Sequence, residues 1–416
     1  MLRYVVTLMV LTCAVACLIG VDDGTNESGD TSVLSLIDDP LTSTTVRGFK
    51  PERRQDQRPM LSEAQYAELA GVLREVYTKP IESWPKANVD EGVAFVEMGA
   101  VGESRFPENN PFTKEKATLG KLLFFDGRLS GTSQMSCGSC HVAELGWGDG
   151  RARSLGHGAK QLGRNTPSML NAAFADRLFW DGRAGSLEEL VVAVLTNEHE
   201  MSTTPDAVVK VVKRIKGYEL MFVEVFGDSE ITMQRIAMAM ATHVRTVVSE
   251  PSSKFDRMLK GHRDALSDSA LRGLHLFRTD ARCVNCHMGP QLTDQKFHNL
   301  GLSYYGRKFE DLGQYNFTGR KEDVGKFRTP SLRNIARTAP YTHVGFFDLK
   351  GMINMYNAGM PMLKRKAKHE GDELFPTKSE LLKPLHLNKQ DRADLQAFLE
   401  SLTERRRRDL LPELPE

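Results

Sequence analysis

The chain of 416 residues has almost no net charge. Its 55 lysines and arginines balance 54 aspartates and glutamates, which leaves a formal charge of +1 at pH 7. Because nucleic-acid binding depends on clustered positive charge, this balance argues against a nucleic-acid partner. One dense basic run, residues 405–408, follows an expected helix, where cations suit the helix dipole, and we interpret it as solvated surface.

The sequence also lacks long runs that alternate between apolar and polar residues, which argues against an extensive β-sheet. Helical periodicity is common instead, and 40% hydrophobic residues are enough for a packed core. We therefore predict an all-α fold with long loops that contain glycine and proline. The expected helices cover residues 62–77, 118–125, 231–248 and 271–277, and a last helix begins near Asn388 and Asp391.

The apolar run at the N-terminus, residues 4–20, falls short of the roughly 20 residues that a membrane-spanning helix needs. With Arg3 before it and small residues at its end, it is typical of a secretory signal. Residues 14–17 fit two cleavage patterns: an ordinary cut after Ala16, and a bacterial lipobox in which Cys17 carries a lipid. Both predict export. Residues 17–60 are mostly polar and are expected to form a flexible linker.

Cysteine is scarce, and its placement is informative. Two of the six cysteines lie in the N-terminal run, and the other four form the strings Cys137-Gly138-Ser139-Cys140-His141 and Cys283-Val284-Asn285-Cys286-His287. Disulfides are the default in an exported chain, but C-x-x-C-H is the pattern of c-type haem attachment. Two thiols add to the two vinyl groups of a haem, and the adjacent histidine binds the iron. Each string offers only three zinc ligands, which disfavours a zinc site.

The sequence therefore predicts two covalently bound haems, with His141 and His287 as the proximal iron ligands. Cys283 follows Cys137 by 146 residues, which suggests one domain for each haem. The expected organisation is a signal peptide (1–16), a linker (17–60), two cytochrome c-like domains packed against each other (61–250 and 251–405) and a tail (406–416). Pro251, after an expected helix, marks the boundary between the domains.

From about Thr118 to Thr403 the sequence resembles the bacterial dihaem cytochrome c peroxidase family, which includes the MauG-type enzymes. The matching segments are residues 119–126 (LGKLLFFD), 163–167 (GRNTP), 179–184 (FWDGRA), 286–290 (CHMGP), 297–299 (FHN), 329–334 (TPSLRN) and 338–341 (TAPY). The resemblance implies that the first haem reacts with hydrogen peroxide and that the second transfers electrons.

The resemblance also implies roles for three residues near the first haem. His157, between Gly156 and Gly158, matches the histidine that caps the first haem of the peroxidases in the resting state and then leaves. Glu200, followed by methionine, matches the family's acid–base catalyst, ahead of its neighbours Glu198 and His199. Such a carboxylate carries a proton between the two peroxide oxygens. Trp180 matches the tryptophan that bridges the haems, although a core aromatic is the simpler interpretation of that residue alone.

Two further sites follow from the resemblance. Asn165, Thr338 and Pro340 fall on the family's calcium site, and calcium accepts amide and backbone oxygens. The sixth ligand of the second haem is methionine in most peroxidases and tyrosine in MauG-type proteins. This position falls on Tyr356, with Met355 or Met352 as the alternative, Met360 and Met362 as outside candidates, and an unligated core stripe as the simplest interpretation.

Three residues depart from the family's pattern. Leu190 and Val194 stand where relatives often carry glutamine and proline beside the peroxide pocket, and Val344 replaces an aspartate. We expect these changes to reshape the pocket without abolishing it.

The sequence thus predicts a periplasmic dihaem peroxidase, an oxidoreductase that reduces hydrogen peroxide to water with electrons from a small cytochrome c or cupredoxin. The first alternative is a MauG-like enzyme in which oxidising equivalents from peroxide act on side chains of a partner protein. The second is a non-catalytic dihaem electron-transfer cytochrome, which would need no acid–base residue such as Glu200. Peroxidases of the family tend to dimerise, which leaves a homodimer open, and membrane contact is expected only through a lipid on Cys17.

Overall fold

The computed structural model describes residues 58–405 and 410–416, all of which belong to one compact unit, Pro51–Glu416. The predicted signal peptide, the lipidation site and most of the predicted linker lie outside the described residues. The described chain is rich in helix and has little strand, as predicted. Within it, no helix combines the length and the apolar character needed to cross a membrane.

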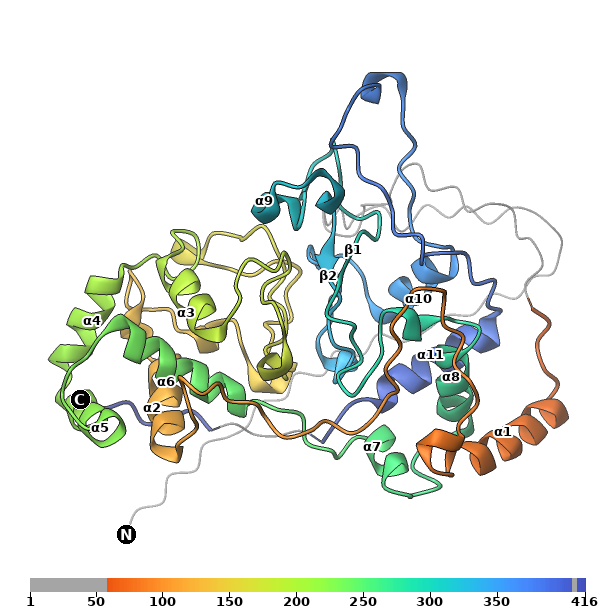
Figure 1. Ribbon diagram of the computed structural model, residues 1–416, viewed down its shortest axis with the longest axis horizontal. Helices are drawn as coiled ribbons and strands as arrows, with labels where there is room; N and C mark the ends of the chain where they lie inside the picture. The colour runs from red at the N-terminus through yellow and green to blue at the C-terminus, as the bar shows by residue number, and fades with distance from the viewer. Residues whose placement is uncertain (1–57, 406–409) are drawn as a thin grey trace, which may run out of the picture. The chain divides into compact units, whose positions relative to one another are not determined.

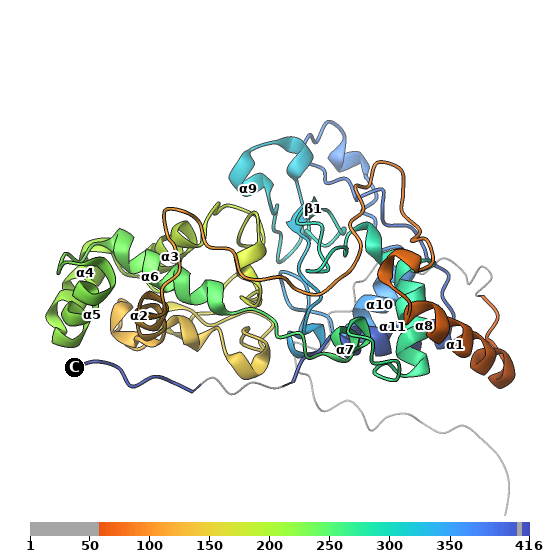
Figure 2. The ribbon, with the colours of Figure 1, turned by 60° about the horizontal axis from the view of Figure 1, so that its bottom comes forward.

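The helices are α1 (Glu63–Tyr77), α2 (Lys114–Phe125), α3 (Leu187–Thr196), α4 (Pro205–Arg214), α5 (Lys216–Phe226), α6 (Met233–Thr246), α7 (Lys254–Leu259), α8 (Asp268–Arg278), α9 (Tyr315–Thr318), α10 (Leu349–Asn357) and α11 (Lys389–Ser401). Two short strands, β1 (Phe297–His298) and β2 (Phe327–Arg328), pair antiparallel. Figures 1 and 2 show α2 to α6 gathered on one side of this strand pair, and α1, α8, α10 and α11 on the other.

The helix starts follow from local capping. Ser62 and Asn388 each form a capping box, in which the cap side chain and the side chain three residues later bind each other's backbone N–H. Helix α2 begins four residues earlier than predicted because Thr113 caps it by accepting a hydrogen bond from the N–H of Lys116. Capping by Thr232 likewise starts α6 two residues later than predicted.

Two pairs of helices cross at a glycine. Gly120 of α2 lies against the backbone of Ala239 in α6, and Gly273 of α8 lies against the backbone of Asp394 in α11. A Cβ at either glycine would overlap the facing carbonyl oxygen. The same arrangement therefore recurs in the two halves of the chain, each time on the helix that precedes a C-x-x-C-H string.

Replacing Gly273 by alanine is expected to lower the free energy of unfolding by about 1–3 kcal/mol, because the new methyl group forces α8 away from α11. The matched control is Gly71→Ala in α1, where a Cβ would meet no atom within 4 Å. That change should stabilise the protein by about 0.5–1 kcal/mol, since alanine favours helix over glycine. Denaturant unfolding of the holoprotein measures both, and similar effects at the two glycines would contradict this account of the crossing.

Separate apolar clusters form on the two sides of the strand pair. One is built from α2 to α6 around Leu119, Tyr218 and Phe222, and Cys137 packs at its edge. Another is built from α1, α7, α8 and α11 around Phe255 and Phe398, with Cys283 at its edge. Each string of haem-attaching residues thus adjoins its own core.

Both ends of the described chain are held by contacts. The carbonyl oxygens of Arg58 and Pro59 accept hydrogen bonds from the amide of Asn388, each at 3.1 Å. At the C-terminus, Arg128 donates to the Pro415 oxygen at 2.9 Å, and the Gly217 N–H donates to the Glu416 oxygen at 3.2 Å. The described part of the predicted tail therefore lies against the first half of the chain.

Candidate active site

A single cavity of about 880 Å³ holds both C-x-x-C-H strings. Its wall contains Cys137, Cys140 and His141 from the first string and Cys283, Cys286 and His287 from the second. Most of the remaining wall is apolar, which suits a large flat macrocycle with few polar atoms.

The first string is shaped by a short turn, Cys137–Ser139, that brings both sulfurs and the following imidazole to the wall of the cavity. His141 donates its Nδ1–H to the backbone oxygen of Trp147 at 2.8 Å. This bond fixes the tautomer and leaves Nε2 as the atom available to a metal. Burial lowers the pKa of His141, which keeps the ring neutral, as a ligand must be.

The second string repeats this geometry. It turns over Cys283–Asn285, and His287 donates its Nδ1–H to the Leu292 oxygen at 3.0 Å. Burial also lowers the pKa of His287. The residues present therefore fit a covalently attached haem at each string.

The thiols do not fit a thioredoxin-like redox pair, which is another use of the C-x-x-C spacing. The four described cysteines form no disulfide with one another, and burial raises the pKa of Cys137 and of Cys283 to about 12. A disulfide-exchanging C-x-x-C needs a thiolate, and therefore a lowered pKa.

Glu200 lies in the loop after α3 and lines the cavity. Its N–H bonds the Asn197 oxygen at 3.0 Å, which holds the loop in a turn, and burial raises its carboxyl pKa. The side chains of Glu198 and His199 are 83% and 73% exposed. Of these three neighbours, Glu200 has the least exposed side chain, and its catalytic role stays a prediction.

Leu190 and Val194 line the same wall as Glu200. Both come from α3, and both are apolar where relatives often carry polar or cyclic residues. They leave the Glu200 carboxyl without a side-chain hydrogen bond in the described chain and contribute to its desolvation.

Trp180 lines the cavity and contacts segments from both halves of the chain. Its indole N–H donates to the Asn165 oxygen at 2.9 Å, and its own backbone oxygen accepts from Arg328 at 2.9 Å. The indole meets the ring of His343 edge-on, with centroids 6.5 Å apart. These contacts hold an aromatic ring in the cavity wall that both strings share.

His157 is placed differently from the other predicted residues. It opens a short turn, His157–Ala159, and its backbone N–H donates to the His199 oxygen at 2.9 Å. Its neighbour Gly156 lines the cavity, whereas the wall does not include His157 itself. Iron ligation by His157 therefore remains a prediction that requires another conformation of this loop.

Helix α10 carries the candidates for the sixth ligand of the second haem. Tyr356 and Met352, one turn apart, both line the cavity. Burial, with a smaller contribution from the nearby Cys286 and Cys283, raises the pKa of Tyr356. Met355 packs in the same apolar cluster as Tyr356 and Met352 but is not part of the cavity wall. The outside candidates lie off the wall, since Met360 is buried elsewhere and Met362 is exposed.

The three predicted calcium residues, Asn165, Thr338 and Pro340, all line the cavity. The Asn165 amide donates to the Arg151 oxygen at 2.7 Å, which leaves its side-chain oxygen as an available ligand. In the described residues, the one cluster of acidic, histidine and cysteine side chains close enough for a metal is Cys286, Asp294 and His298. That cluster shares no residue with the predicted calcium set.

Sequence analysis missed two residues of the site. His343 stacks on Phe327 at a centroid distance of 3.7 Å, and burial lowers its pKa to about 4. Arg164 pairs with Asp181 at 2.6 Å and with Asp311 at 2.7 Å, and so joins the two halves of the chain. Both lie in the part of the chain that the resemblance covers, but each also contacts a residue more than 100 positions away, Asp311 for Arg164 and Trp180 for His343.

The comparisons with known proteins agree with this geometry. Residues 114–264 match the family model described as di-haem cytochrome c peroxidase. The methylamine utilization protein MauG of Methylophilus methylotrophus is 37% identical over 300 residues, which cover 71% of this chain and 84% of that protein. This chain belongs to the dihaem cytochrome c peroxidase/MauG family.

Other relatives carry the peroxidase name. Cytochrome-c peroxidase IdrP1 of Pseudomonas sp. (strain SCT) is 37% identical over 71% of this chain and 83% of its own length. Among solved structures, a MauG-like protein associated with microbial copper homeostasis has a TM-score of 0.65 and 34% identity, covering 73% of this chain and 93% of its own. Membership implies two c-type haems and an oxidoreductase that acts on peroxide.

Proposed function

We propose that this protein is a dihaem c-type peroxidase that reduces hydrogen peroxide to water with electrons from a small redox protein. The observation that carries the proposal is the enclosed carboxyl of Glu200 in the same cavity as the first haem-attaching string. A purely electron-transferring cytochrome has no need of this group. Turnover of hydrogen peroxide by the purified dihaem protein, with a small cytochrome c or a cupredoxin as donor, tests the proposal.

The haem supplies the iron that binds peroxide and the electrons that break its O–O bond. Reduction of one H₂O₂ to two waters consumes two electrons and two protons. Glu200 takes the proton from one peroxide oxygen and delivers it to the departing oxygen, and its raised pKa suits a group that must both accept and donate. Trp180, in the wall shared by the two strings, provides an aromatic path for the electrons.

The proposed architecture is two cytochrome c-like domains, residues 61–250 around the peroxide-reactive haem and residues 251–405 around the electron-transfer haem. The separate apolar clusters and the repeated glycine crossing support this division. Calcium bound by Asn165, Thr338 and Pro340 would join the two domains, because these residues come from both. We also propose a periplasmic location on the basis of the signal-like N-terminus, while lipidation of Cys17 and homodimer formation remain predictions.

A second function, MauG-like oxidation of side chains on a partner protein, is favoured by one observation. Tyr356 lines the cavity that holds the second string, and Met355 is not among the residues of its wall. A tyrosine ligand stabilises higher oxidation states of iron, and methionine raises the reduction potential.

Electron paramagnetic resonance of the oxidised protein distinguishes the two functions. If the protein is a peroxidase, a first haem held by His141 and His157 would be low-spin at rest and would become high-spin after addition of one electron, once His157 is released. In that case, His157→Ala should show the high-spin signal at rest, whereas His199→Ala, which changes an exposed neighbour, should not. A high-spin first haem already present in the wild-type protein at rest would instead support the MauG-like function and remove His157 from the mechanism.

A further inference from the structure

Arg328 is the exception among the arginines of the cavity wall. Five arginines line it, and four of them pair with a carboxylate. These four pairs are Arg164 with Asp181 and Asp311, Arg183 with Asp181, Arg282 with Asp90, and Arg333 with Asp256. Arg328 forms no ion pair with any residue that the structure describes, and the hydrogen bond of its guanidinium there is a long one, from Nη1 to the Gln295 Oε1 at 3.5 Å.

The guanidinium of Arg328 is enclosed as well as unpaired. Its Nε is buried and has no hydrogen-bond partner in the described chain. Burial lowers its pKa to about 10, with no nearby carboxylate acting in the opposite direction. An enclosed cation is costly unless an anion compensates it, so this position calls for a negative charge that the described protein does not supply.

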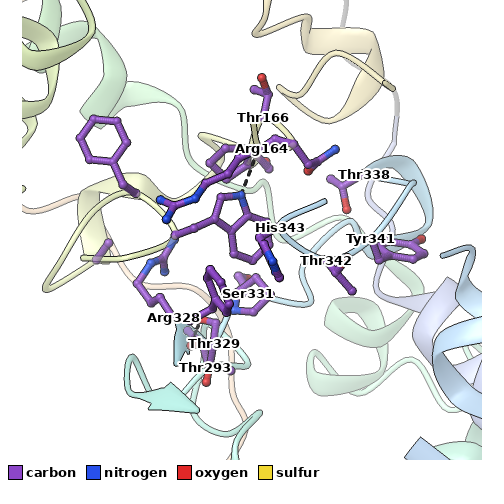
Figure 3. A pocket seen from close by; sticks show the side chains of 18 of the residues that line it. Arg164, Thr166, Thr293, Arg328, Thr329, Ser331, Thr338, Tyr341, Thr342 and His343 are labelled. Atoms are coloured by element: carbon purple, nitrogen blue, oxygen red, sulfur yellow. Dashed lines mark hydrogen bonds between the residues drawn. The ribbon is translucent and has the colours of Figure 1, made fainter. Parts of the chain in front are cut away.

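The surroundings of Arg328 place it beside the second haem-attaching string. It lies on β2, two residues before Pro330, whose backbone interacts with the ring of His287. Thr293 Oγ1 donates to the Thr329 oxygen at 2.7 Å and ties β2 to the loop after His287 (Figure 3). The backbone N–H of Arg328 donates to the Trp180 oxygen at 2.9 Å.

We propose that Arg328 binds a propionate carboxylate of the haem attached at Cys283 and Cys286. A guanidinium presents parallel N–H donors that match both oxygens of a carboxylate. The thioether bonds would confine the haem to this cavity, so its propionates would be held at a high local concentration. The proposal rests on haem attachment at the second string, which the proposed function also requires, but not on any reaction with peroxide.

This contact has two consequences. The fixed positive charge favours the ferrous over the ferric state, so Arg328 raises the reduction potential of the second haem. It also keeps the propionate ionised. Because the same residue bonds the backbone of Trp180, the carboxylate lies next to the proposed path between the haems.

The test compares Arg328→Gln with Arg328→Lys in the holoprotein, with Arg153→Gln as the control. Arg153 also lacks a carboxylate partner in the described chain, but it lies outside the cavity wall. Spectroelectrochemistry, without peroxide, gives the potential of each haem between pH 5 and 8. Pyridine haemochrome analysis gives the number of haems per chain.

We expect Arg328→Gln to lower the equilibrium constant for reduction of the second haem about tenfold, a shift of 59 mV for one electron. Its potential should also become more pH-dependent, because the unpaired propionate takes up a proton on reduction. Arg328→Lys should recover most of the shift, and Arg153→Gln should have no effect. Unchanged potential and pH dependence in Arg328→Gln would overturn the proposal, and so would a shift confined to the first haem.

A structural role alone would not link the potential of one haem to pH. If Arg328→Gln fails to accumulate with two haems, the lysine variant keeps the proposal testable. Its propionate bending vibration in the resonance Raman spectrum should shift from that of the wild type, and an unchanged vibration would overturn the contact. Absence of peroxide turnover in the wild-type protein would count against the proposed function. It would not change what the Arg328 variants show about the propionate contact.

Discussion

Replacing Glu200 by glutamine is expected to lower kcat for peroxide turnover by roughly 10²–10⁴-fold, the usual contribution of a positioned acid–base group. Glutamine has nearly the same shape but can neither take nor deliver the proton. Because Glu200 is not among the predicted iron ligands, the absorption spectra of both haems should stay unchanged. Stopped-flow measurement of peroxide consumption at several concentrations gives the loss directly.

The pH dependence of the wild-type protein provides a second readout. Burial raises the pKa of Glu200, and a base must be deprotonated to accept a proton. Activity should therefore be complete above this raised pKa and fall as the pH drops through it. The acid limb should begin at a higher pH than for an exposed glutamate, and it should vanish from the residual activity of Glu200→Gln.

The matched control is Glu198→Gln, which makes the same change two residues earlier on an exposed side chain. It should leave kcat within a factor of about two, because exposed carboxylates away from the cavity contribute little. If Glu200→Gln keeps wild-type turnover, proton transfer does not depend on this residue and the proposed mechanism is wrong.

Replacing Tyr356 by methionine is expected to raise the reduction potential of the second haem by at least roughly 0.1 V, since axial ligands set haem potentials over about 0.8 V. Tyrosine ligation favours ferric iron, whereas methionine favours ferrous iron. The substitution should also replace histidine–tyrosine signals by histidine–methionine signals in the paramagnetic resonance spectrum. Spectroelectrochemistry and spectroscopy on the same samples measure both effects.

Helix α10 offers a close control. Met355→Leu changes the residue next to Tyr356 at nearly constant volume, and Met355 is not part of the cavity wall. It should alter neither the potential nor the spectrum. If instead Met352→Leu shifts the potential and Tyr356→Met does not, the ligand is the methionine one turn earlier on the same wall.

The potential of the wild-type second haem then distinguishes the two functions. A high potential suits the storage of an electron for peroxide reduction. A low potential with tyrosine ligation suits the withdrawal of electrons from a protein substrate. The relatives named MauG and cytochrome-c peroxidase IdrP1 are each 37% identical to this chain, so sequence similarity does not choose between the two functions. The potential of the second haem does.

Several features were predictable from the sequence because they depend on neighbouring residues. The caps at Ser62 and Asn388 involve residues three positions apart, and α1 and α11 begin at these residues as predicted. We placed the start of α2 too late. The first turn after its cap, Thr113, is polar, so it lacks the apolar periodicity by which we located helices. The glycine crossings were not predicted, because a glycine shows its close contact only when the partner helix is known.

The features of the site also divide into those that neighbouring residues determine and those that depend on distant parts of the chain. The sequence by itself determined the class of cofactor, because haem attachment requires only five consecutive residues whose chemistry is local. Only the tertiary structure brought Glu200, Trp180 and Tyr356 to one cavity, left Met355 out of its wall, and left Arg328 as the unpaired arginine of that wall. Burial and pairing depend on side chains far apart in the chain, so no local pattern encodes them.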